Sequence, residues 1–257
     1  MIKLDKVSKK FGTGVFGLSN ISFNVDKGEF VFLVGPSGSG KTTIFRLLIR
    51  EILPTGGTIV INDWDIVGLP KAKIPHLRKK VGVIFQDLKL LMDRTIFENV
   101  MLPLEVAEVE LEEAKKRVNE VLAQVGLATH KEKFPVQLSG GELQRTAIAR
   151  ALVLSPDIIL ADEATGNLDM ANSWDIIKIL TDINEKGTTI VMATHNLDII
   201  KNLPKRIIEM DKGNIAKDSK LPKEKKDVKI DNSHHFRHHK IPDIHEQKSD
   251  TIKEEQK

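Results

Sequence analysis

Residues 35–42 read GPSGSGKT, a glycine-rich spacing that is typical of a phosphate-binding loop. The pattern G-x-x-x-x-G-K-[ST] between a strand and a helix lets backbone N–H groups close around phosphate oxygens, and the helix N-terminus adds partial positive charge. We expect Lys41 to reach the β- and γ-phosphates of a nucleotide and the Thr42 hydroxyl to bind Mg²⁺. The pattern therefore predicts a nucleotide site built from Gly35, Pro36, Ser37, Gly38, Ser39, Gly40, Lys41, Thr42 and Thr43.

Two adjacent carboxylates follow an apolar run at residues 157–161. At the carboxyl edge of a parallel sheet such side chains face a ligand crevice. Asp162 is predicted to hold Mg²⁺, and Glu163 is predicted to orient and polarise an attacking water as a general base. An Asp-Glu pair alone is more often a solvated loop start, so this prediction depends on the phosphate loop occurring in the same chain.

A second glycine pair lies in the segment 138–145, which reads LSGGELQR. Ser139 is a good N-cap with Glu142 three residues later, so one interpretation is simply a well-capped helix that runs to about residue 154. Gly140 and Gly141 also bare the backbone at this helix N-terminus, which suits the γ-phosphate of a nucleotide held by another subunit. Both interpretations stay open at this point.

The segment resembles the LSGGQ signature of the ABC (ATP-binding cassette) ATPase family, with Glu142 in place of its Gln. This resemblance implies that the chain binds ATP and Mg²⁺ and hydrolyses ATP as a homodimer that sandwiches the nucleotide. It implies catalytic roles for Lys41, Glu163 and a switch histidine, His195. The other positions that match the family are Gln86, which binds Mg²⁺ and senses the γ-phosphate, Asp169, whose loop crosses between subunits, and Phe11, which stacks on adenine.

The elements that must position these residues follow from apolar patterning. Runs at residues 29–34, 81–85, 157–161 and 188–193 are typical of strands buried on both faces, which form a parallel sheet covered by helices. Helical patterns follow at 41–52 and 108–125. We expect an α/β fold of the P-loop NTPase type, with a mixed or parallel sheet core. The ABC-type nucleotide-binding domain is predicted at residues 1–216, with a helical subdomain inserted at about residues 87–155.

Composition limits the remaining classes of function. The 257 residues carry a net charge of +3, which is too balanced for a nucleic-acid-binding surface, and their 40% hydrophobic content suits a sizeable core. No apolar run approaches the roughly 20 residues of a membrane span, and the N-terminus has no signal-peptide pattern, so we expect a cytoplasmic position. The absence of cysteine excludes disulfides and thiolate metal sites.

Residues 217–257 show neither helical nor strand periodicity. They alternate charged residues with isolated aliphatic ones and cannot bury enough apolar surface to offset the entropy of ordering. We predict a disordered tail. Metal binding is the alternative, because five of the eight histidines lie there, namely His234, His235, His238, His239 and His245.

Residues 86–100, which read QDLKLLMDRTIFENV, are similar to the FtsE family of cell-division ATP-binding proteins. The runs at 134–137, 162–169 and 192–195 are also similar, and the resemblance covers about residues 1–216. It implies an FtsX-like integral membrane partner and a peripheral position at the cytoplasmic face of the cell membrane. Signalling would then pass across the membrane to cell-wall hydrolases.

The resemblance also places the partner's docking surface near Leu88–Val100. Met92 and Phe97 are candidates for a groove that faces the partner, since methionine and aromatic side chains are frequent at such surfaces. Leu90, Leu91 and Ile96 suit the core of the helical subdomain instead.

Two other functions remain open on the sequence. Lipoprotein-releasing and macrolide-export ATPases also carry the TGNLD run and differ in membrane partner rather than in chemistry. A soluble ABC ATPase that acts on ribosomes or DNA is disfavoured, because this chain has one unbroken cassette and no strong basic patch.

Overall fold

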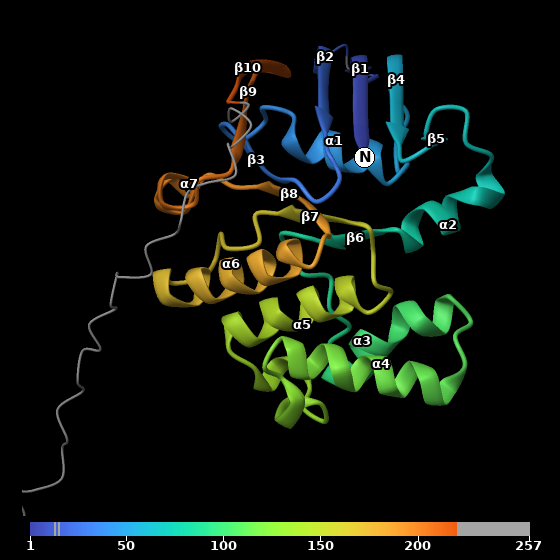
Figure 1. Ribbon diagram of the computed structural model, residues 1–257, viewed down its shortest axis with the longest axis vertical. Coiled ribbons are helices and arrows are strands. Elements are labelled where there is room, and N and C mark those ends of the chain that lie inside the picture. The colour runs from blue at the N-terminus through green and yellow to red at the C-terminus, as the bar shows by residue number, and fades with distance from the viewer. Residues whose placement is uncertain (13, 15, 220–257) are drawn as a thin grey trace, which may run out of the picture. The chain divides into compact units, whose positions relative to one another are not determined.

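The computed structural model describes residues 1–12, 14 and 16–219 (Figure 1). All of these described residues belong to one compact unit. The predicted tail lies almost wholly outside the described residues, and so do its histidines. Lys217 and Asp218, the first two residues assigned to the tail, belong instead to the strand Asn214–Asp218. The other boundaries predicted for the domain and its subdomain stay predictions.

A six-stranded sheet forms the centre of the fold, in the order β10-β9-β3-β8-β7-β6. Five of its strands run parallel, and β10 pairs antiparallel with β9. The four strands predicted from apolar runs are confirmed, and no strand end differs from its prediction by more than one residue. The strands are β3 (Phe30–Val34), β6 (Val81–Ile84), β7 (Ile158–Asp162), β8 (Thr189–Ala193), β9 (Arg206–Asp211) and β10 (Asn214–Asp218).

A second, four-stranded sheet was not among the predicted elements. It has the order β2-β1-β4-β5, and all of its neighbours pair antiparallel. Its strands alternate buried and exposed residues, as in β1, where Ile2 and Leu4 are buried and Lys3 and Asp5 are exposed. The strands are β1 (Ile2–Lys10), β2 (Phe16–Val25), β4 (Gly56–Ile61) and β5 (Trp64–Asp65).

Helices cover both faces of the parallel sheet. The helices are α1 (Lys41–Leu48), α2 (Ile74–Lys79), α3 (Ile96–Val106), α4 (Leu111–Gln124), α5 (Gly140–Leu152), α6 (Met170–Glu185) and α7 (Leu197–Asn202), with short 3-10 helices η1 (Lys71–Lys73), η2 (Ala128–His130) and η3 (Pro135–Gln137). Helix α1 ends four residues before the predicted end at residue 52. In the segment 87–155 the helices α3, α4 and α5 pack against one another, and all of that segment is described.

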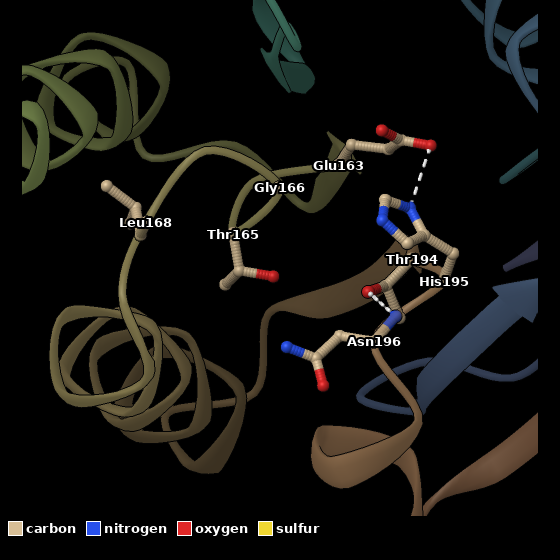
Figure 2. Close-up of a pocket in the computed structure, with 7 residues that line it drawn as sticks. All are labelled: Glu163, Thr165, Gly166, Leu168, Thr194, His195 and Asn196. Carbon is tan, nitrogen blue, oxygen red and sulfur yellow. Dashed lines mark hydrogen bonds and ion pairs between the residues drawn. The ribbon is translucent and has the colours of Figure 1, made fainter.

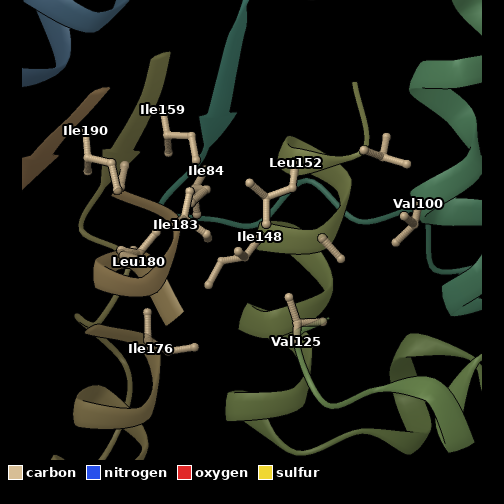
Figure 3. Packing of buried hydrophobic residues seen from close by; sticks show 14 of the residues in the cluster. Ile84, Val100, Val125, Ile148, Leu152, Ile159, Ile176, Leu180, Ile183 and Ile190 are labelled. Atoms are coloured by element: carbon tan, nitrogen blue, oxygen red, sulfur yellow. The ribbon is translucent and has the colours of Figure 1, made fainter. Parts of the chain in front are cut away.

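Alternate residues of each central strand pack into two different cores. Val31 and Leu33 of β3 lie with α1 and the antiparallel sheet, whereas Phe30 and Phe32 lie with the helices on the opposite face. Figure 3 shows this second core, where Ile159 and Ile190 of the sheet face α6 and Ile148 of α5 points toward the sheet and α6. Because such a strand is packed on both faces, its carboxyl end, and the residues that follow it, are held in a fixed position.

The loop before α3 is held by one buried amide. The Asn99 side chain accepts from the Leu91 N–H at 2.8 Å and donates to the carbonyls of Leu91 (2.9 Å), Arg94 (3.1 Å) and Thr95 (2.9 Å). The backbone of Leu91 is thereby turned inward and its side chain is 37% exposed. The prediction that Leu91 belongs to the subdomain core is therefore wrong.

The neighbouring residues of that loop differ in exposure. Ile96 is fully buried, Leu90 is half-buried, and Phe97 is half-buried and packs against the core. Met92 is 60% exposed. In the described part of the chain no helix is both long and apolar enough to span a membrane.

Candidate nucleotide-binding site

The glycine-rich loop connects β3 to α1, as its sequence pattern predicted. Gly40, the N-cap of α1, has a φ of 108°, and a Cβ at this position would lie 2.7 Å from the Gly17 carbonyl oxygen. Only glycine fits such a backbone. The first turn of α1 contains no acidic residue and its N-cap carries no side chain, so the helix N-terminus offers its N–H groups and partial positive charge to an anion.

The side chains of the loop suit a phosphate ligand. Lys41 is buried, and its ammonium donates to the carbonyls of Gly35 (2.7 Å) and Pro36 (3.0 Å), which places the charge over the loop. The buried Ser39 hydroxyl has no hydrogen-bond partner among the described residues. A buried polar atom without a partner is unusual, and here it lies in the loop that the pattern assigns to phosphate.

Thr42 and Asp162 meet beside the loop although 120 residues separate them. The Thr42 hydroxyl donates to Asp162 Oδ2 at 2.9 Å. Burial raises the pKa of the Asp162 carboxyl, while the hydrogen bond from Thr42 and the charge of Lys41 oppose that rise. These two oxygens are hard donors of the kind that Mg²⁺ prefers, and phosphate oxygens and water would supply the rest of its octahedral shell.

The Glu163 carboxylate lies between two other predicted site residues. Gln86 Nε2 donates to one of its oxygens at 3.1 Å, and His195 Nδ1 lies 3.3 Å from the other. Figure 2 shows His195 turned toward Glu163 across a pocket that Thr165, Gly166, Leu168, Thr194 and Asn196 also line.

The backbone of Glu163 explains this orientation. Its φ is 50°, which is uncommon for a residue with a side chain, and its N–H donates to the Ala193 carbonyl of β8 at 3.0 Å. Strain of this kind persists only where the surroundings fix it, and it concentrates at functional sites. The chain thus turns sharply after β7 and directs the carboxylate along the edge of the sheet.

The LSGGE segment forms a second group of predicted residues. Ser139 caps α5 and Glu142 completes a capping box, so the helix-cap interpretation is confirmed. A Cβ at Gly141 would lie 2.5 Å from Asn172 Oδ1, and Asp169 holds Asn172 by accepting from its amide at 2.7 Å. Within the described residues, no hydrogen bond or ion pair links Ser139, Gly140, Gly141, Glu142 or Asp169 to the phosphate-loop group.

Phe11 lies near the phosphate loop through the β1–β2 connection. A Cβ at Gly17 would be 2.6 Å from the Phe11 ring and 3.4 Å from the Thr43 side chain. Gly17 therefore lies against both the ring and the first turn of α1. Lys9 Nζ lies 5.5 Å from the ring centroid. A half-buried ring at this place suits stacking on a base, and the ammonium of Lys9 already uses one ring face.

Arg150 is a site residue that the sequence analysis missed. From α5 its guanidinium donates to the carbonyls of Leu88 and of Lys89, the latter at 2.6 Å. Both of these residues adopt positive φ, at 57° and 51°. Burial lowers the pKa of Arg150. The arginine therefore fixes the backbone at Leu88 and Lys89, shortly after Gln86. In the sequence, the indication of this role was a charged residue among the buried apolar positions of α5.

This geometry defines a P-loop nucleotide-binding domain of the ATP-binding cassette type. Residues 18–166 match the ABC transporter family. The chain is 48% identical over 218 residues to the cell division ATP-binding protein FtsE of Bacillus subtilis, covering 85% of this chain and 96% of that protein. The FtsE protein of Escherichia coli K12 is 41% identical over 215 residues, with coverage of 84% and 97%.

Solved structures agree with these relatives. The dimeric structure of MJ0796, a bacterial ABC transporter cassette, is 37% identical with a TM-score of 0.79 and covers 86% of this chain and 99% of that chain. A second dimeric structure of MJ0796, in a post-hydrolysis state bound to ADP and Pi, gives 36% identity with the same TM-score and coverage. The chain belongs to the ABC transporter family, beside the FtsE cell-division ATP-binding proteins.

Family membership confirms that the chain binds and hydrolyses ATP. It also confirms the predicted P-loop α/β fold. The names of the relatives support the cell-division function over the lipoprotein-releasing, macrolide-export and soluble alternatives.

Replacing Arg150 tests its role in fixing the segment after Gln86. An Arg150→Lys variant keeps the charge but cannot hold two carbonyls with one planar group, so that segment and Gln86 should shift. Because small misplacements at a reacting centre are costly, we expect kcat for ATP hydrolysis to fall by about tenfold or more. Steady-state ATPase kinetics measure this change.

Arg117→Lys on α4 is the matched control, since Arg117 forms an exposed pair with Glu113 at 2.7 Å. It should retain the parent kcat. If Arg150→Lys and Arg117→Lys both kept parent kinetics, Arg150 would have no role in the site.

Proposed function

We propose that this chain is the ATP-hydrolysing subunit of an FtsEX-like complex that couples ATP turnover to a membrane partner in cell division. The observation that carries the catalytic part is the Glu163 carboxylate, which lies within 3.1 Å of Gln86 Nε2 and 3.3 Å of His195 Nδ1. Two other chain segments therefore converge on this carboxylate next to the phosphate loop.

In the proposed reaction a water molecule attacks the γ-phosphorus of ATP. A new oxygen–phosphorus bond forms, the bond from the γ-phosphorus to the bridging oxygen of ADP breaks, and the proton of the water passes to Glu163. His195 and Gln86 hold that carboxylate and sense the γ-phosphate. Lys41 binds the β- and γ-phosphates at the floor of the site.

Magnesium completes the proposed substrate complex. Thr42 and Asp162 would bind Mg²⁺ directly or through water, and Gln86 would contribute through its amide oxygen. The ion would neutralise charge that develops on the phosphates. The 2.9 Å contact between Thr42 Oγ1 and Asp162 Oδ2 supports this assignment, because it brings both oxygens to one place.

The sandwich dimer follows from what one copy lacks. Gly40 and Lys41 close one side of the triphosphate, whereas Ser139 and Gly140 are exposed at the N-terminus of a different helix. A second copy of the chain could bring that N-terminus to the open side of the γ-phosphate, with Asp169 near the contact. The dimeric MJ0796 cassette bound to ADP and Pi supports this arrangement.

An FtsX-like integral membrane protein is the proposed partner, and the chain would lie peripherally at the cytoplasmic face of the membrane. The docking surface is Leu88–Val100, where the Asn99 amide holds the loop in one conformation. Met92 is its most exposed apolar side chain, and a pre-ordered loop binds at a lower entropic cost.

Glu163→Gln tests the proposed reaction. Loss of a positioned base typically costs 10²–10⁴-fold in rate, so kcat should fall by about that factor. ATP affinity should remain. The variant should dimerise when ATP is added, because the sandwich dimer forms but its ATP is not hydrolysed. Equilibrium ATP binding and sedimentation velocity measure these outcomes.

Two variants serve as controls for that experiment. Lys41→Ala should lose ATP affinity and should not pair, whereas Glu120→Gln on the exposed side of α4 should behave like the parent. Hydrolysis by Glu163→Gln at the parent rate would show that Glu163 is not the base.

Met92→Asp tests the docking surface. A charge at the centre of an apolar contact should reduce capture of the FtsX-like protein from detergent-solubilised membranes by tenfold or more, while ATPase activity of the isolated chain stays at the parent value. Val106→Asp is the control, because Val106 is also apolar and exposed but lies at the far end of α3. Equal capture by the parent and Met92→Asp would exclude this surface.

A further inference from the structure

The signature helix of this chain begins with a full negative charge where the family signature has a neutral amide. Glu142 Oε2 accepts from the backbone N–H and from the hydroxyl of Ser139, both at 2.7 Å. These hydrogen bonds, with the charges of His130 and Lys133, hold the pKa of Glu142 below its usual value. A carboxylate so close to the predicted contact with a triphosphate repels it unless a cation compensates.

His130, on another element, supplies that compensation when its imidazole is protonated. Its Nε2 lies 3.0 Å from Glu142 Oε1, the oxygen that faces away from Ser139. The pair is partly shielded from water, since the two side chains are 24% and 21% exposed. With His130 protonated, the attraction between these two groups exceeds that of a fully exposed ion pair.

The imidazole is held on both of its nitrogens. Thr129 Oγ1 lies 3.0 Å from His130 Nδ1, so the ring cannot turn away from Glu142 without losing that contact. The backbone that follows is fixed to α3, because Ile96 N–H donates to the Lys133 carbonyl at 2.8 Å and Phe97 N–H donates to the Lys131 carbonyl at 2.9 Å. His130 is thus held in place beside the N-terminus of α5 by a backbone that is hydrogen-bonded to α3.

We propose that His130 is a positioning residue, which neutralises Glu142 and keeps the start of the signature helix able to receive the triphosphate bound by a second copy of the chain. This inference rests on the sandwich dimer of the proposed function. His130 touches neither the nucleotide nor the reacting water, and it acts through Glu142 and Ser139. In a chain with a neutral residue at position 142, His130 would be dispensable.

A double-mutant cycle tests the proposal in the Glu163→Gln background, where ATP-driven pairing is measured without turnover. The dissociation constant of the ATP-bound dimer is determined for the parent, His130→Gln, Glu142→Gln and the double variant by sedimentation. His130→Gln should weaken pairing by about five- to tenfold, the size expected for a partly shielded ion pair. In the Glu142→Gln background the same change should have an effect of less than twofold.

His130→Lys extends the test, since it restores a cation without the imidazole shape. It should pair within about twofold of the parent, whereas a purely structural role for the ring would leave it as weak as His130→Gln. Thermal unfolding of each variant separates loss of fold from loss of pairing. The proposal is wrong if His130→Gln weakens pairing equally with Glu142 and with Gln at position 142. It is also wrong if His130→Gln does not weaken pairing at all.

If the proposed sandwich dimer itself does not form, the experiment gives a different result. The Glu163→Gln parent with its native His130 would then remain monomeric at every ATP concentration. In that outcome the proposed function is overturned first, and the role of His130 falls with it. If the Glu163→Gln protein does pair with ATP, but the effects of His130→Gln and Glu142→Gln on pairing simply add, only the inference about His130 is overturned.

Discussion

The whole site depends on parallel strands that end at one edge of a sheet. β3, β8, β7 and β6 are neighbours, and their carboxyl ends carry the phosphate loop, His195, Asp162 with Glu163, and Gln86. Each of these strands is buried on both faces, so its end cannot shift without disturbing two cores. Side chains that are far apart in the sequence therefore meet within hydrogen-bonding distance, and the positive φ of Glu163 completes the geometry.

One copy of this edge provides only half of what hydrolysis needs. In the proposed complex the phosphate loop and the carboxylates bind the triphosphate from one side. Ser139 and Gly140 lie at the N-terminus of α5, without a link to that group among the described residues. Arg150 joins the two regions mechanically, since it reaches from α5 to the backbone after Gln86. The helical subdomain therefore holds the proposed docking loop and the signature helix in one packed unit, with the Arg150 side chain as a contact between them.

Sequence reasoning succeeded where chemistry demands a fixed spacing. The phosphate loop, the strand ends and the Ser139 cap each follow from local rules, so their places were predictable. The antiparallel sheet escaped prediction because strands such as β1 are buried on one face only and carry charged residues at alternate positions. Leu91 was misjudged since the buried Asn99 side chain binds its backbone, and no apolar pattern reveals such a contact. Arg150 and His130 act through partners 61 and 12 residues away, and only the fold brings these together.

Mixing two inactive variants tests the central claim that each nucleotide lies between two copies of the chain. Lys41→Ala disables the phosphate loop, and Gly140→Asp places a carboxylate at the signature helix, where its Cβ would meet only the Leu168 side chain at 3.5 Å. A mixed dimer contains one site with an intact loop from one copy and an intact signature from the other. Equimolar mixing should therefore restore ATP hydrolysis that neither variant shows alone. A mixture that stays as inactive as its components, although both variants are folded, would contradict the claim.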